Sequence, residues 1–205
     1  MSIGFSLSII LSTIGLMDGF EASMYKVLRH VNADISLFSR KGFLKLDEVA
    51  EKFKQYKDSS LAVTRVESYL IKDAKNKGVL IHGFDSSLAS ELSFFPYSNL
   101  VLKENEIAIG DELSRELNLK EGDQAVLMIK NFYDDGIGAP KLISVQIKSI
   151  VDHGLYKADQ RFVYLNRKKL NEYLHLDDNV SNTFFINIDN AQEDFRDIIL
   201  NTKDR

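Results

Sequence analysis

Side chains that could carry out chemistry are few in this sequence and do not cluster. The four histidines include no pair at the spacing of zinc ligands; they are His30, His82, His153 and His175. Cysteine is absent, which excludes thiolate metal sites and thiol nucleophiles. An isolated histidine is more often hydrogen-bonded or solvated than a metal ligand. We therefore expect no metal site and no cofactor.

Acid pairs and glycine-rich turns offer no better candidate for a reacting centre. Asp134-Asp135 and Asp177-Asp178 lie in polar stretches, and adjacent turn residues rarely converge on one reacting bond. Gly136-Ile137-Gly138 lacks the third glycine of a dinucleotide fingerprint, and no Walker-type Gly-Lys-Ser/Thr run exists. A secreted or tethered hydrolase with a site near 94–97 would need a nucleophile beside a base, and no motif supplies one. The sequence predicts a protein that is not an enzyme and does not itself bind ATP.

The charge balance argues against nucleic acid as a partner. The 205 residues carry a formal net charge of −4, and basic and acidic side chains are interleaved instead of forming a basic stripe. With 44% hydrophobic residues, the chain can bury a core in one domain or in two small lobes. We expect a folded domain whose partners are not nucleic acids.

Residues 1–17 contain no charged side chain and are predicted to lie in a membrane. A full span needs about 20 apolar residues, so we expect the C-terminal part of a first transmembrane helix whose cytoplasmic start is missing. A signal peptide would begin with Lys or Arg and end in a cleavage site of small residues, and neither is present. A buried core helix remains the alternative. The large apolar residues of the span are Phe5, Leu7, Ile9, Ile10, Leu11, Ile14 and Leu16.

Charges begin at Asp18, but a helical period of apolar residues continues through 18–32. This pattern predicts an amphipathic stalk that continues the membrane helix and could carry motion to a domain outside the bilayer. A surface helix packed on its own domain would show the same pattern. The stripe consists of Phe20, Met24, Val27, Leu28 and Val31.

The stretch 107–130 predicts a strand, a helix, a tight turn and a second strand. The strand at 107–109 is followed by a short helix with Asp111 as its N-cap, a turn at 120–123, and a strand from Gln124. The helix has one apolar face, which must lie on a sheet. That face consists of Leu113, Leu117 and Leu119.

The other predicted elements alternate between strands and helices, which indicates a mixed α+β fold. They are strands at 33–38, 61–71, 79–84, 142–150 and 183–188, and helices at 47–57, after Asn166 and after Asn190. A long hairpin with a turn at 72–78 is expected, and 85–97 is expected to be a loop. The residues predicted to face inward are Val49, Phe53 and Tyr56 in the first helix, and Ile143, Val145 and Ile147 in the strand at 142–150.

Three motifs together resemble the periplasmic core domain of MacB/FtsX-type ABC permeases. The run 107–130 is similar to the family's pattern of an apolar strand, Gly-x-x-Leu-Ala, Leu-x-Leu and Gly-Asp, with Ser114 in place of Ala. Met17-Asp18-Gly19-Phe20-Glu21 resembles the Met-Asn-Gly-Phe-Glu that follows the first membrane helix of LolC/LolE-type permeases. The stretch 150–165 is similar to a third motif, with His153 where Ser is usual, at a position expected to be a turn.

The resemblance implies a two-lobe MacB-like periplasmic core domain at 33–205, with an inserted lobe at roughly 111–161. It also implies the extracytoplasmic domain of an inner-membrane permease that passes lipoproteins to a soluble periplasmic carrier. The expected partners are then the carrier, the lipoprotein substrate, a partner permease subunit and a separate cytoplasmic ATPase. The alternative is a MacB/FtsX-like domain that transmits movement mechanically to an adaptor or a cell-wall hydrolase.

The connection 131–141 is longer than the hairpin it joins requires, since a loop of about two to five residues would be enough. Exposed aromatic residues are typical of partner-binding surfaces. The resemblance implies a hook that captures the carrier, and we name 131–141 the hook loop. A loop folded back on its own core is the alternative. The expected binding residues are Phe132, Tyr133, Ile137, Pro140 and Lys141.

Overall fold

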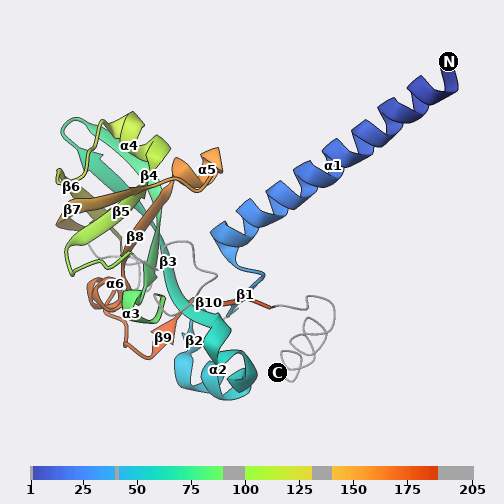
Figure 1. Cartoon of the computed structure of the whole chain (residues 1–205). Helices are drawn as coiled ribbons and strands as arrows, with labels where there is room; N and C mark the ends of the chain where they lie inside the picture. The colour runs from blue at the N-terminus through green and yellow to red at the C-terminus, as the bar shows by residue number, and fades with distance from the viewer. Residues whose placement is uncertain (1, 40–41, 90–99, 131–139, 189–205) are drawn as a thin grey trace.

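The computed structural model describes residues 2–39, 42–89, 100–130 and 140–188 (Figure 1). Its first element is α1 (Ser2–Asn32), a 31-residue helix that extends away from the rest of the chain. No proline interrupts it. The Thr13 hydroxyl donates to the Ile9 carbonyl one turn earlier, so this polar side chain is satisfied within the apolar helix. The residues expected as span and stalk thus form one continuous helix.

An eight-stranded sheet forms the body of the domain and closes on itself. Its strands are β1 (Ile35–Phe38), β3 (Ser60–Lys72), β4 (Lys75–Phe84), β5 (Glu106–Gly110), β6 (Gln124–Ile129), β7 (Lys141–Val151), β8 (Phe162–Asn166) and β10 (Thr183–Ile186). Their spatial order is β1-β10-β3-β4-β8-β5-β7-β6, and β6 also pairs with β3. The six strands from β3 to β6 in this order therefore form a closed barrel, which β10 and β1 extend on one side.

The length of β3 makes the closure possible. Its residues 60–63 pair with β10, and its residues 68–71 pair with β6 further along the same edge. Arg65 lies between these two partners, where the side chain of Asn182 replaces a strand. The Arg65 N–H donates to the Asn182 side-chain oxygen at 2.7 Å, and the Asn182 amide donates to the Arg65 carbonyl at 2.5 Å. The backbone at the gap is thus satisfied.

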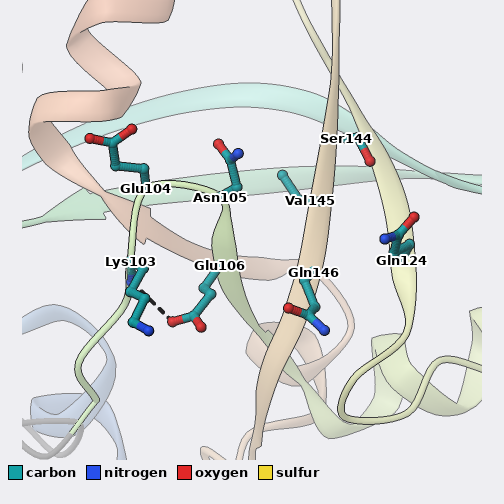
Figure 2. Close-up of a pocket in the computed structure, with 8 residues that line it drawn as sticks. All are labelled: Lys103, Glu104, Asn105, Glu106, Gln124, Ser144, Val145 and Gln146. Carbon is teal, nitrogen blue, oxygen red and sulfur yellow. Dashed lines mark hydrogen bonds between the residues drawn. The ribbon is translucent and has the colours of Figure 1, made fainter.

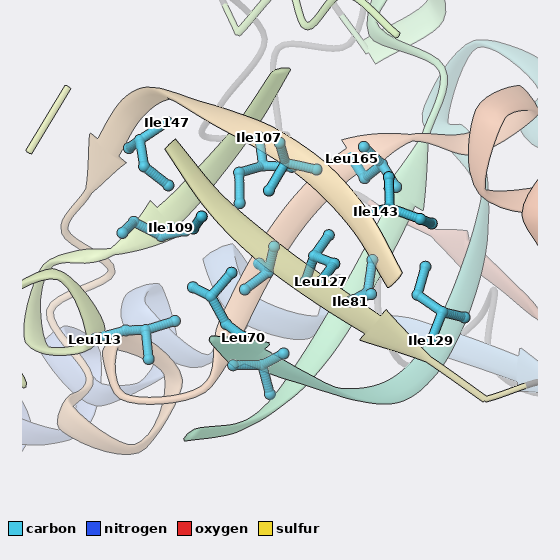
Figure 3. Packing of buried hydrophobic residues seen from close by; sticks show 14 of the residues in the cluster. Leu70, Ile81, Ile107, Ile109, Leu113, Leu127, Ile129, Ile143, Ile147 and Leu165 are labelled. Atoms are coloured by element: carbon cyan, nitrogen blue, oxygen red, sulfur yellow. The ribbon is translucent and has the colours of Figure 1, made fainter. Parts of the chain in front are cut away.

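The barrel interior is filled by aliphatic side chains that alternate with outward-facing residues along each strand. Figure 3 shows these residues converging from all six strands; they include Leu70, Ile81, Ile107, Ile109, Leu127, Ile147 and Leu165. A second cluster contains Tyr164, Phe84 and Phe185. On β8, Val163 and Leu165 belong to the first cluster and Tyr164 to the second, so the β8 region is buried on both faces.

Short helices complete the α+β fold, and several predicted features of them are confirmed. They are α2 (Leu46–Lys52), the 3-10 helix η1 (Lys54–Ser59), α3 (Ser86–Ala89), α4 (Asp111–Leu117), α5 (Tyr156–Asp159) and α6 (Arg167–Tyr173); β2 (Leu44–Lys45) and β9 (Val180–Ser181) form a small separate sheet. The Asn166 side chain accepts from the Lys169 N–H and caps α6, as predicted. The expected inward residues are buried: Leu113, Leu117, Leu119, Val49, Phe53, Tyr56, Ile143, Val145 and Ile147.

Five local predictions were wrong. The stretch 85–97, expected to be a loop, contains the helix α3 at Ser86–Ala89. The N-cap of α4 is Gly110, and Asp111 is instead its first residue, bound to Arg115 in an ion pair at 2.5 Å. The helix predicted at 47–57 begins one residue earlier and continues as a 3-10 turn after Lys52. The turn predicted at 72–78 has only two residues, because Lys72 already pairs with Lys75. The first strand begins at Ile35 and not at Ala33, whose φ of 57° is left-handed.

Other expectations extend beyond what the structure describes or tests. Residues 111–161 contribute β6 and β7 to the same barrel as β3 and β4, and the boundary of an inserted lobe stays a prediction. The last predicted strand is β10, which ends at Ile186. The helix expected after Asn190 and the aromatic residues at 94–97 lie outside the described residues.

Candidate functional site

The lower end of α1 meets the barrel domain at its last turns. Nη2 of Arg65 donates to the Asn32 side-chain oxygen at 3.1 Å. Val27 lies near Gly154, since a Cβ built on this glycine would lie 3.8 Å from Cγ2 of Val27. Val31, between Val27 and Asn32, is buried. We call this region, where α1 meets the barrel, the junction.

Two further hydrogen bonds support the junction from the first residues after α1. The Ser36 hydroxyl donates to the Asn32 carbonyl at 2.9 Å, and the Tyr25 hydroxyl lies 3.2 Å from a carboxylate oxygen of Asp34. The other oxygen of Asp34 accepts from the Ile188 N–H at 2.9 Å. The chain that leaves α1 is thereby tied both to the helix and to the end of the sheet.

Above Tyr25, which contacts Asp34, every α1 side chain that the structure describes is exposed. Gly4–Tyr25 is the one helical stretch among the described residues that is long and apolar enough to cross a membrane, and none of it is buried. A core helix would bury such side chains within its domain, and in this structure they are not buried; the membrane assignment stays a prediction. More than half of the surface is exposed in each predicted span residue: Phe5, Leu7, Ile9, Ile10, Leu11, Ile14 and Leu16. Of the predicted stalk residues, Phe20, Met24 and Leu28 are exposed, and Val27 is half-buried.

A row of five side chains lies beside the junction, and all but Arg65 are buried. Arg65 on β3 lies opposite His82 on β4, and His82 lies opposite Tyr164 on β8. From Tyr164 the row continues to His153, whose Nε2 is 2.5 Å from the tyrosine hydroxyl. Nδ1 and the backbone N–H of His153 then reach one oxygen of Asp159, at 2.5 and 2.9 Å. We name these five residues the junction row.

The hydrogen-bond roles in this row follow from the chemistry of the partners. A carboxylate oxygen can only accept, so Nδ1 of His153 donates to Asp159. Nε2 of a neutral ring is then the acceptor for the Tyr164 hydroxyl. Burial lowers the pKa of His153, while the hydrogen bond and charge of Asp159, and the charge of Asp152, act in the opposite direction. The arrangement therefore fits a neutral imidazole.

His82 is the least satisfied member of the row. Its Nε2 is buried and has no hydrogen-bond partner among the described residues. Its ring packs on Phe162, with centroids 4.3 Å apart, and meets the edge of Tyr164 at 5.6 Å. Burial lowers the pKa of His82 well below its usual value, and the nearby Arg65 and His153 lower it further. Burial also lowers the pKa of Arg65, to about 10. Its guanidinium carbon lies 4.7 Å from the centre of the Phe185 ring.

The order Asp159, His153, Tyr164 resembles a catalytic relay, but it is inaccessible to a substrate. The His153 side chain is 0% exposed and Tyr164 is 2% exposed. The described residues also contain no group of three or more His, Asp or Glu side chains that could hold a metal ion. The row therefore acts in packing and hydrogen bonding at the junction.

The predicted hairpin around the hook loop is confirmed, and its tip lies outside the described residues. β6 and β7 pair antiparallel, with Ile129 opposite Lys141. Phe132, Tyr133 and Ile137 lie outside the described residues. Pro140 and Lys141 are described and exposed, and Nζ of Lys141 lies 5.3 Å from the centre of the Tyr173 ring.

Two open grooves lie on the outer surface of the barrel. One, of about 270 Å³, adjoins the base of the hook loop and is lined by Lys130 and Pro140 together with Tyr69, Met128 and Arg161. The other, of about 490 Å³, crosses β5, β7 and β6, where Glu106, Gln146 and Gln124 stand side by side (Figure 2). Polar side chains line most of this second groove, which is typical of a solvated sheet face.

Sequence reasoning missed the junction row. His153 was expected in a turn, yet it is buried and hydrogen-bonded on both ring nitrogens. The third motif, at 150–165, did draw attention to this stretch, but it gave no indication of partners on β3, β4 and β8. The residues of the row are far apart in sequence, and only the strand order brings them together.

Comparison with known proteins gives likenesses of fold only. No family model and no curated protein matches the sequence. Solved structures similar to this chain include the extracellular domain of the noncanonic ABC-type transporter YknZ from Gram-positive bacteria, with 11% identity, 79% of this chain and 86% of that chain covered, and a TM-score of 0.48. Another is the periplasmic region of MacB from Actinobacillus actinomycetemcomitans, with 10% identity, 82% and 73% covered, and a TM-score of 0.47.

Proposed function

We propose that this chain is the extracytoplasmic domain, with part of the first membrane helix, of an ABC transporter permease that releases lipoproteins from the bacterial inner membrane. The lipoprotein passes to a soluble periplasmic carrier, and a separate cytoplasmic ATPase subunit supplies the energy. A partner permease subunit completes the membrane part. The observation that carries this proposal is an exposed apolar helix whose lower end is joined to a closed barrel by the hydrogen bond from Arg65 to Asn32.

The membrane boundary is proposed near Met17, with 18–32 as a stalk. An acidic side chain at the centre of a membrane helix costs about 2.5–3.5 kcal/mol, which disfavours placing Asp18 deep in the hydrocarbon. The apolar side chains before it need no water contact, and they gain about 25 cal/mol for each Å² of surface removed from water. The stalk then holds the barrel outside the bilayer.

Lipoprotein release is favoured over other transport by two features. The Met17–Glu21 motif resembles that of LolC/LolE-type permeases at the same place after the first membrane helix. In addition, the β6–β7 hairpin is joined by a loop longer than its paired ends require, and a groove with an exposed Tyr69 lies at the loop's base. A carrier held by Phe132, Tyr133 and Ile137 would rest against this groove.

Mechanical transmission to an adaptor or a cell-wall hydrolase is the second candidate. It is favoured by the junction itself, because a continuous helix joined there to the barrel would pass a tilt in the membrane to the barrel. Both candidates use this coupling. They differ in the partner that the outer domain engages.

Vesicle flotation with added partners tests the proposal and separates the two candidates. The full chain is reconstituted into phospholipid vesicles, floated, and incubated with a purified lipoprotein carrier or with a periplasmic adaptor. We expect the vesicles to retain the chain and the carrier but not the adaptor. A matched control carries Ile10→Asp and Ile14→Asp, which should prevent flotation while leaving the barrel intact.

Each other result has a distinct meaning. A chain that stays in the soluble fraction would refute the membrane assignment. Vesicles that hold the chain and bind the adaptor instead would favour mechanical transmission. Titration with ATP should not raise the melting temperature, whereas one tight site stabilises by about 2.7 kcal/mol at a hundredfold excess of ligand over Kd.

A further inference from the structure

The hydrogen bond at the end of α1 is made by a member of the junction row, because Arg65 donates to Asn32. His82, next to Arg65 in the row, is buried, and its Nε2 has no hydrogen-bond partner among the described residues. A change at His82 can therefore reach the contact with α1. Further along the row, His153 immediately precedes Gly154, the residue near Val27. His82, Tyr164, His153 and Asp159 are buried, so these four cannot relieve a new charge by turning into water.

We propose that the junction row is a pH-sensitive latch: protonation of His82 and His153 loosens the attachment of α1 to the barrel. The inference rests on the proposed function in one respect: a domain on the outer side of the inner membrane is exposed to changes in the external pH. The latch is closed at neutral pH and opens on acidification.

Protonation of His153 would disturb a hydrogen bond that its neutral form satisfies. A proton on Nε2 turns this atom into a donor, so it can no longer accept from the Tyr164 hydroxyl. The tyrosine oxygen would have to accept instead, which requires its own O–H to reorient. The bond to Asp159 would persist and strengthen, because it joins opposite charges. Acid therefore rearranges the contact between His153 and β8.

Protonation of His82 would place a second cation beside Arg65. The two residues are directly opposite on β3 and β4, and the row's one carboxylate, Asp159, is already bonded to His153. Asp152 is the other acid that acts on His153, and it is exposed. His82 is buried and Arg65 is half-buried, so water screens their repulsion only in part. The half-buried side chain of Arg65 can move away from His82, and this side chain holds Asn32.

The junction should open before the barrel unfolds. Of the α1 side chains that the structure describes, Val31 alone is buried. The three hydrophobic clusters contain no buried residue from α1. A contact with so little buried apolar surface opens at a small fraction of the free energy of global unfolding.

Distance measurements between two spin labels test the latch in the full chain. The protein has no native cysteine, so Leu28→Cys and Tyr156→Cys, both at exposed positions, give one label on each side of the junction. Double electron–electron resonance is recorded in phospholipid vesicles and in detergent between about pH 7.5 and about pH 5, which brackets the usual histidine pKa. We expect one narrow distance at the higher pH. A second, broader population should grow on acidification by about tenfold per pH unit for each proton taken up.

Variants identify the groups responsible. His82→Phe keeps an aromatic ring, and His153→Gln keeps a side chain that can donate and accept, so the double variant should hold the narrow distance over the whole range. If the double variant does not fold, His82→Phe alone is the test, and it should move the transition to lower pH. His175→Asn, at an exposed residue with φ of 57°, is the matched control and should respond as the parent does.

Two results would overturn the inference. One is a parent whose distance does not change with pH; the other is a double variant that broadens as the parent does. A failure of the proposed function would be distinguishable from a failure of the latch. A chain that does not enter vesicles would refute the membrane assignment, while the pH response in detergent would still stand or fall by itself.

Discussion

Gly110 lies directly against the backbone of Asp159. A Cβ built on this glycine would overlap the Asp159 carbonyl, so no larger residue fits without displacing α5. Its backbone is extended, with φ of −65° and ψ of 151°, and any residue could adopt it. Glycine is therefore needed for space and not for conformation. The contact places Asp159 where its carboxylate meets His153.

Gly110→Ala should destabilise the protein and disturb the junction row together. The added methyl must push away backbone, and overpacking of this kind costs about 1–3 kcal/mol or more. Thermal unfolding followed by circular dichroism measures the loss. Gly78→Ala is the matched control, because its Cβ would meet only Tyr69 Cε1, at 3.9 Å. Equal melting temperatures for the two variants would show that α5 yields without cost.

The stability of the chain should fall as the pH drops below the usual histidine pKa. The pKa values of His82 and His153 are lowered in the folded state, so the unfolded state binds more protons once the pH falls below about 6.5. The loss approaches about 1.4 kcal/mol per pH unit for each histidine until its folded pKa is reached. Above about pH 6.5, His82 and His153 should not change the free energy of unfolding.

Thermal melts of His82→Phe over the same range check this prediction. The variant should lose less stability on acidification than the parent, and His175→Asn should lose as much. The ion-paired acids Glu116 and Glu172 do not interfere, since their lowered pKa values place their effect below the ordinary carboxylate range. An unchanged slope in His82→Phe would assign the acid sensitivity to other groups.

Local chemistry predicted those elements whose determinants are close together in sequence. The Asn166 cap, the turn at 120–123 and the alternation of Ile143, Val145 and Ile147 all depend on residues within a few positions of one another. The prediction of Asp111 as the helix cap was wrong, because Gly110 occupies the cap position and allows close approach to α5. An acid such as Asp111 is also favourable in the first turn of a helix.

Barrel closure could not be predicted, because it depends on pairing between distant strands. Ser68 lies opposite Ile129, and nothing in the apolar period of either strand specifies the other. The hairpin turn was expected to be longer because the polar residues 75–77 read as loop. They continue β4 to Lys75, and Asp73, with φ of 52°, forms part of a two-residue turn. The junction row could be recognised only from this strand order.

Removal of residues 1–17 should leave a folded, soluble domain. The buried residues of all three hydrophobic clusters come from positions after Asn32, so the deletion removes no part of the core. We expect a melting temperature within a few degrees of that of the full chain in detergent. Loss of the cooperative transition would mean that the apolar segment belongs to the fold and that the membrane assignment is wrong.

The hook loop is the element proposed to bind the carrier, and the structure describes only its base. Lys130 and Pro140 stand at the two ends of a confirmed hairpin, beside the groove that contains Tyr69. Two explanations account for the apolar residues between them. In one they anchor a partner, and in the other they fold back to cover the domain's own surface. The two differ in whether stability or binding depends on these side chains.

Replacing Phe132, Tyr133 and Ile137 with Ser should abolish retention of the carrier and leave the melting temperature within a few degrees. Side chains that contact only a partner contribute to the complex and not to folding. A loop that covers the core would instead lose about 2 kcal/mol or more for each large apolar residue removed, which lowers the melting temperature of a domain of this size by several degrees. Leu142→Ser, at a residue of the same hairpin that is 65% exposed, is the matched control and should bind the carrier as the parent does. A large drop in melting temperature with carrier binding retained would refute the hook.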